Sequence, residues 1–132
     1  MTGHLIVVDW LGRPHTMNDE RRKNHHELSR IHKAWREAGA QACMIARPPV
    51  MGRVKVTCWA RYKTRVHTDP EGIAPALKCV LDGVVDRGVI LDDTSRYVAE
   101  VRFLPAVTGP SMPDALLVHL EEVLHDAVIY PA

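Results

Sequence analysis

The sequence lacks the features of a membrane or secreted protein. Its longest uninterrupted apolar runs are short, such as Leu5 to Val8, whereas a membrane-spanning helix needs about 20 consecutive apolar residues. The N-terminus has neither the basic start nor the apolar centre of a secretory signal. We therefore expect a cytoplasmic protein without a membrane partner.

Cysteine and histidine patterns that are typical of disulfide or zinc scaffolds are also absent. The three cysteines, Cys43, Cys58 and Cys79, are far apart and form no CxxC pair. The eight histidines show no HExxH-like spacing, and the adjacent His25 and His26 would not share a face of a helix. We expect buried free thiols and neither a disulfide framework nor a histidine-based zinc site.

Internal repeats and low-complexity linkers are missing as well. The 132 residues suit one domain rather than two. Hydrophobic residues make up 46% and charged residues 25%, an ordinary globular mixture. We expect a single domain over residues 1–132, in which residues 122–132 form a short helix or a loose tail.

Charge is divided unevenly along the chain. Residues 1–66 carry 13 Lys and Arg against 5 Asp and Glu, a net +8, and residues 67–132 carry 4 against 11, a net −7. Such polarity often marks a basic surface for a polyanion beside an acidic cluster. The alternative is that the two halves fold together and neutralise each other, and charge alone does not separate these readings.

Hydrophobic periodicity predicts the order β-α-β-α-β-β. This order is typical of an α+β (mixed α/β) domain, with a small mixed sheet packed by two helices. The apolar stripe of the first helix could belong to the core or to an interface. The expected strands cover residues 4–9, 54–66, 96–104 and 115–121, and the expected helices cover residues 19–45 and about 75–87.

The strand at residues 54–66 alternates between an apolar face, with Thr64 as the exception, and a face that is mainly cationic with Trp59 among the cations. Because strand side chains have a period of two, one face would pack in the core and the other would carry a row of cations. This row could bind the phosphates of DNA, or it could be a solvated sheet face. The candidate DNA-binding residues are Lys55, Arg61, Lys63 and Arg65.

Acidic residues flank the second expected helix. Asp69 and Glu71 precede it, and Asp92 and Asp93 follow it. If these carboxylates converge, they need a cation, and oxygen ligands of this kind select Mg²⁺ or Mn²⁺. A carboxylate-bound metal suits phosphodiester cleavage, with Lys78 neutralising the phosphate or its leaving oxygen.

Each of these features also has a purely structural interpretation. Asp69 and Pro70 form a good helix-start signal, and Asp92 and Asp93 could form a turn. Lys78 and Asp82, four residues apart, could be an ordinary surface ion pair. It is the occurrence of all these features together that favours a catalytic site.

The segment "DPEG…PALKCVLDGVVDRGVILDD" resembles the signature of RusA-type Holliday junction resolvases, and the resemblance covers most of residues 10 to 105. Asp69 and Glu71 match the family's first and second acids, and Lys78 matches its functional lysine. Asp92 and Asp93 match its closing acidic pair. The resemblance implies Asp69, Lys78 and Asp93 as catalytic residues, and Asp69, Glu71, Asp92 and Asp93 as metal ligands.

The resemblance further implies a RusA-like, Mg²⁺-dependent homodimer that binds four-way DNA junctions and cuts them symmetrically. Two positions depart from the family pattern: Glu71 stands where Asp or a small residue is typical, and Gly72 stands where Asn is usual. Three alternatives stay open: a branched-DNA-binding module with weakened catalysis, a nuclease for other branched or flapped DNA, and an interaction protein without a nucleic-acid role.

Overall fold

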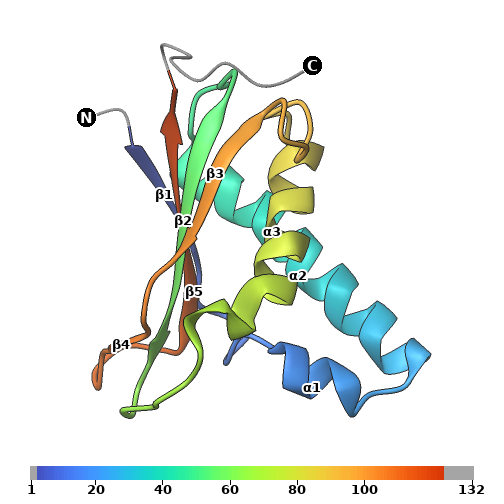
Figure 1. Ribbon diagram of the computed structural model, residues 1–132, viewed down its shortest axis with the longest axis vertical. Coiled ribbons are helices and arrows are strands. Elements are labelled where there is room, and N and C mark those ends of the chain that lie inside the picture. Colours follow the sequence, from blue (N-terminus) through green and yellow to red (C-terminus); the bar gives the residue numbers. More distant parts are fainter. Residues whose placement is uncertain (1–2, 124–132) are drawn as a thin grey trace.

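The computed structural model describes residues 3–123 and has a five-stranded sheet with its two long helices together on one side (Figure 1). The prediction of an α+β domain with a small mixed sheet is therefore confirmed. The predicted terminal helix or tail lies, from residue 124 onward, outside the described residues. Among those residues, no helix combines the length and apolar character that crossing a membrane would need.

The sheet has the strand order β1-β5-β2-β3, and the short strand β4 also pairs with β2. Strand β2 is parallel to β3 and β4 and antiparallel to β5, which in turn is antiparallel to β1. Strand β4 lies in a segment that the sequence predicted to be a loop. The strands are β1 (Gly3–Val8), β2 (Val54–Tyr62), β3 (Val98–Phe103), β4 (Val107–Thr108) and β5 (Ala115–Glu122).

The first helical region is two helices, α1 (Met17–Arg21) and α2 (His25–Ala46). The prediction of one helix over residues 19–45 is wrong at its start because two caps compete with a continuous helix. The Thr16 side chain accepts a hydrogen bond from the Asp19 backbone N–H and caps α1. The Asn24 side chain accepts one from the Glu27 backbone N–H at 3.0 Å and caps α2.

The helix after β2 is α3 (Ala74–Asp86), preceded by one 3₁₀ turn, η1 (Pro70–Ile73). Helices α2 and α3 approach each other at two glycines. An added Cβ at Gly39 would lie 2.4 Å from the Val80 carbonyl oxygen, and one at Gly83 would lie 2.2 Å from the Arg36 carbonyl oxygen. This close packing leaves no room for a side chain and fixes α3 against α2.

The core lies between the sheet and the two long helices. Ile6, Val56 and Leu120 face it from the sheet, and Trp35 of α2 and Val80 of α3 face it from the helices, each with at most 4% exposure. The apolar stripe of α2 is therefore part of the core. All three cysteines are buried and free, as the sequence predicted.

Strand β2 ends at Tyr62, four residues before the predicted end at Val66. Its antiparallel partner β5 begins at Ala115, which pairs with Arg61. Lys63 is the first residue after β2, and its backbone N–H donates to the Asp114 carboxylate instead of to a neighbouring strand. The predicted cationic row therefore does not continue as one strand face to Asp69.

Candidate functional site

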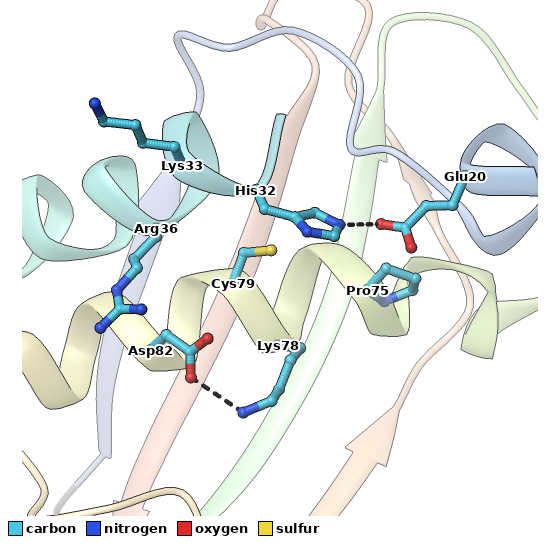
Figure 2. Close-up of a pocket in the computed structure, with 8 residues that line it drawn as sticks. All are labelled: Glu20, His32, Lys33, Arg36, Pro75, Lys78, Cys79 and Asp82. Atoms are coloured by element: carbon cyan, nitrogen blue, oxygen red, sulfur yellow. Dashed lines mark hydrogen bonds and ion pairs between the residues drawn. The ribbon is translucent and has the colours of Figure 1, made fainter. Parts of the chain in front are cut away.

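The structure gathers a lysine and two carboxylates at one edge of α3. The Lys78 ammonium donates to the Asp82 carboxylate at 3.1 Å, one turn further along the helix, and also to the Asp93 carboxylate. Lys78 and Asp82, whose ion pair Figure 2 shows, are among the residues that line a cleft between α2 and α3, the α2–α3 cleft, which has a volume of about 510 Å³. Two of the three residues expected to be catalytic thus contact each other.

Asp93 reaches Lys78 because the chain reverses after α3. Gly88 adopts a left-handed conformation with φ of 74°, which favours glycine, and ends the helix. The next two residues, Val89 and Ile90, are buried and pull the chain back against the core. Asp92 then accepts a hydrogen bond from the Asp93 backbone N–H at 2.8 Å, which holds the turn.

The charges in this cluster reinforce one another. The hydrogen bond to Asp93 raises the pKa of Lys78, and the same bond holds the pKa of Asp93 below its usual range. The Lys78 side chain stays 62% exposed and that of Asp93 20% exposed. The cluster therefore presents an accessible ammonium between two carboxylates, an arrangement that can receive a phosphate or a cation.

Asp69 and Glu71 lie just before the N-terminus of α3, at the 3₁₀ turn η1. Asp69 caps η1, since its carboxylate accepts a hydrogen bond from the Glu71 backbone N–H at 3.1 Å. The Asp69 side chain lines a second cleft of about 570 Å³, which we call the loop cleft. The helix-start interpretation of this segment is thus confirmed, and both carboxylates remain exposed to solvent.

The four predicted metal carboxylates are not gathered at one point. Within residues 3–123, the one group of three or more side chains with metal-ligating atoms within 4.8 Å of one another contains none of them. Their donor chemistry fits Mg²⁺ or Mn²⁺, because Asp69, Glu71, Asp92 and Asp93 all offer hard carboxylate oxygens. Asp69 and Asp93 nevertheless belong to different surroundings, the loop cleft and the Lys78 cluster.

Of the predicted DNA-binding residues, Arg61 is the one that the structure buries. Its side chain is 8% exposed, and its guanidinium donates to the Pro113 carbonyl oxygen through Nε at 3.1 Å and through a terminal nitrogen at 3.0 Å. Gly109 packs on the same side chain, since a Cβ there would lie 3.0 Å from it. Arg61 therefore fastens the loop before β5 to β2.

The other three predicted cations differ in their surroundings. Lys55 is exposed on β2, but its cross-strand neighbours are Glu100 on β3 and Glu121 on β5. Lys63 and Arg65 are exposed in the segment that follows β2. The two loop residues are therefore better placed for phosphate contacts than Lys55, which two carboxylates flank.

Two cations beside Asp69 were not among the site residues predicted from the sequence. Arg13 and Arg22 line the loop cleft together with His67 and Asp69. The Arg13 guanidinium stacks over the Tyr62 ring, 4.8 Å from its centroid, which holds Arg13 at the end of β2. No periodic pattern could have found these residues, because they come from the loop before α1 and from the end of α1.

The structure also brings together three side chains that sequence analysis did not connect, His15, His32 and Cys79. His15 is 6% exposed and Cys79 is 6% exposed, whereas the His32 side chain is 45% exposed. Burial lowers the pKa of His15 and raises the pKa of the Cys79 thiol to about 11. The prediction of no histidine-based metal site thus overlooked a group that only the tertiary structure assembles.

No protein-family model matches the sequence, and no curated protein matches it. What the chain does is therefore inferred below from the geometry and chemistry of the site.

Proposed function

We propose that the protein is a Mg²⁺-dependent, structure-specific endodeoxyribonuclease that cleaves branched DNA, with four-way junctions as substrate. The observation that carries the proposal is the contact of Asp93 with Lys78 beside Asp82, at a cleft with cationic side chains around it. A lysine held between carboxylates supplies what phosphodiester cleavage requires, a cation for the phosphate and ligands for a metal.

In this proposal the chain's own residues divide the work. The Lys78 ammonium has three N–H donors, and Asp82 and Asp93 accept two of them, which leaves a third for a phosphate oxygen. Asp69 and Asp93, with Glu71 or Asp92, would be drawn together from the loop cleft and the Lys78 cluster to hold Mg²⁺, which activates a water and stabilises charge on phosphorus when it is bound.

Exposed cations would hold the DNA backbone on either side of the cut. Lys63 and Arg65 follow β2, and Arg13 and Arg22 line the loop cleft beside Asp69. Contacts to phosphates position DNA without reading its sequence, so the shape of the junction would dominate recognition. A homodimer belongs to the same proposal, since two sites related by a two-fold axis match a two-fold junction. So does a cytoplasmic location.

The test is cleavage of a panel of four-way junctions, flaps and forks in Mg²⁺, in Mn²⁺ and without metal. We expect wild type to cut junctions only with a divalent metal and Asp93→Asn to bind the junction without cutting it. Asp86→Asn is the matched control, because Asp86 lies on α3 but pairs with Arg36 instead of Lys78. Equal cleavage by Asp93→Asn and wild type would refute the proposal. The homodimer is tested separately, by sedimentation of wild type with and without DNA.

A binding module without cleavage is the second candidate, and a specific observation favours it. No three of the predicted carboxylates in the described residues meet within metal-ligand distance of one another. Junction binding without cleavage in every divalent metal would select this function. Cleavage of flaps or forks in preference to junctions would instead select a nuclease with a different branched substrate.

A further inference from the structure

We propose that His15, His32 and Cys79, with Glu20, form a second metal site that binds one Zn²⁺-like cation and ties α1, α2 and α3 together. This site is distinct from the carboxylates of the proposed nuclease centre and does not rest on that function. Its residues come from four separate parts of the chain, namely the loop before α1 (His15), α1 itself (Glu20), the first half of α2 (His32) and the first half of α3 (Cys79).

The donor atoms already face one another. The two histidines and the cysteine each offer one ligand atom, and these atoms lie within 4.8 Å of one another. Zinc bonds of about 2.0–2.3 Å place tetrahedral ligand atoms about 3.5 Å apart. Closing around a cation therefore requires shifts of about 1 Å, which side-chain rotation supplies without moving a helix.

The Glu20 carboxylate stands beside both imidazoles. Its Oε2 lies 3.0 Å from His15 Nε2 and 2.6 Å from His32 Nε2. Figure 2 shows the His32 ring from α2 and the Cys79 thiol from α3 both directed toward Glu20. Glu20 is therefore placed to be the fourth ligand.

A second, independent observation that points to a ligand at this place is the buried imidazole of His15. Both ring nitrogens of His15 are inaccessible to solvent, and neither has a hydrogen-bond partner in the described structure. The contact of His15 Nε2 with Glu20 is close enough for an ion pair but lacks the direction of a hydrogen bond. A buried imidazole in this condition costs stability unless something binds it, and a metal would use its lone pair.

The chemistry of the donor set selects the cation. Imidazole nitrogen and thiolate sulfur suit Zn²⁺ and disfavour Mg²⁺, which prefers oxygen ligands. A thiolate on Cys79 and a carboxylate on Glu20 together carry the charge that a divalent cation neutralises. Lys78 lines the same cleft as Glu20, His32 and Cys79, but its ammonium is paired with Asp82 and Asp93, and Figure 2 shows it beside Asp82.

The site would act as a staple between the helices. Cys79 adjoins Lys78 in sequence, so a cation on Cys79 would fix the part of α3 that presents the proposed catalytic lysine. Binding to the folded chain alone stabilises it by mass action. We therefore expect Zn²⁺ to raise the unfolding temperature of the chelator-treated protein, and to raise that of the Cys79→Ser variant by much less, with the same concentration of Mg²⁺ present in both.

The experiment measures Zn²⁺ binding to the full chain, stripped of metal, reduced and free of DNA, by competition with a chromophoric chelator. We expect one Zn²⁺ per chain. Cys79→Ser and His32→Ala should each bind at least about 10- to 100-fold more weakly, since even the outer partners of metal ligands contribute that much. Co²⁺ should give a thiolate charge-transfer band in wild type that Cys79→Ser loses.

Two control variants separate the site from general effects on folding. Cys43→Ser removes an equally buried thiol outside the group, and His25→Ala removes an exposed imidazole at the start of α2. Both should bind Zn²⁺ as wild type does. The proposal is overturned if wild type binds no Zn²⁺, or if the controls lose as much affinity as the ligand variants. His32→Ala keeps the test decisive if Cys79→Ser does not fold, because the His32 side chain is largely at the surface.

Discussion

Asp93 follows Lys78 by 15 residues, yet its carboxylate accepts a hydrogen bond from the Lys78 ammonium. Between them the chain completes α3, reverses at Gly88 and buries Val89 and Ile90. The contact thus results from the helix length and the turn together. A change in either would separate the lysine from its carboxylate without touching the residues that carry the chemistry.

The first prediction concerns Lys78 itself. Lys78→Gln should lower junction cleavage by about 100-fold or more, because removing one group that stabilises developing charge has an effect of that size. The free energy of unfolding should change by less than about 1 kcal/mol, since the Lys78 side chain is 62% exposed and solvent weakens its ion pair. Lys33→Gln is the matched control, because Lys33 lines the same cleft from α2. Comparable losses in both variants would show that overall cleft charge, and not Lys78, matters.

The second prediction separates two kinds of cation that the sequence presents alike. Arg61→Gln should destabilise the fold by about 1.5–3 kcal/mol, because it removes charged hydrogen bonds to the Pro113 carbonyl from a buried position. Lys63→Gln and Arg65→Gln should leave stability nearly unchanged. They should instead weaken DNA binding and reduce the salt dependence of log K by about 1 per residue.

Urea denaturation and binding titrations at several salt concentrations test this division. If Arg61→Gln folds as stably as wild type, the hydrogen bonds to Pro113 do not contribute as argued. If the two loop variants bind DNA as wild type does, the phosphate-contact assignment of Lys63 and Arg65 is wrong.

The sequence predicted most of the architecture because periodicity reports local burial. The alternation in β2 and the stripe on α2 each identified a core face, and the structure places Val56 and Trp35 there. The prediction of one helix over residues 19–45 failed at its start, because apolar periodicity reports the buried face of a helix and not the residue at which its backbone begins. Asn24, which caps α2 through the Glu27 backbone N–H, was not identified from the sequence.

The candidate sites could be predicted only in part. Lys78 and Asp93 were both named as site residues from one segment, but their contact depends on the chain reversal at Gly88, and the burial of Arg61 depends on Pro113, which lies far along the chain. The grouping of His15 with Cys79 depends on how α1 and α3 pack and has no signature in spacing. Residues brought together by tertiary packing alone leave no periodic signal.

The third prediction tests the close approach of α2 and α3. Gly83→Ala should destabilise the protein by about 2 kcal/mol or more, because the new methyl would meet the Arg36 carbonyl oxygen and force the helices apart. This exceeds the gain of about 1 kcal/mol that alanine normally brings to a helix. Gly72→Ala is the control, since a Cβ at Gly72 meets no atom within 4 Å.

Urea denaturation of both glycine variants checks this prediction. We expect Gly72→Ala to change the free energy of unfolding by less than about 1 kcal/mol. A Gly83→Ala protein as stable as wild type would mean that the two helices can separate at little cost, and the position of Lys78 would then not depend on their packing.

The fourth prediction concerns pH and the ion pair between Arg36 and Asp86. The guanidinium donates to both carboxylate oxygens, at 2.7 and 2.8 Å, and this holds the pKa of Asp86 below its usual range. A carboxyl with a depressed pKa in the folded state stabilises the protein above its unfolded pKa of about 3.9, and this contribution disappears as the pH falls through the folded pKa.

Wild type should therefore unfold at a slightly higher temperature than Asp86→Asn at about pH 5 to 8, where the Asp86 carboxyl is ionised in both the folded and the unfolded state. The difference should shrink as the pH falls below about 4 and vanish once the folded carboxyl is protonated. It should be small at every pH, because both side chains are about half exposed, at 53% and 42%. Arg36→Gln should show the same pH dependence as Asp86→Asn, since each variant removes one partner of the same pair. A difference from wild type that persists unchanged at low pH would mean that Asp86 acts through packing instead of charge.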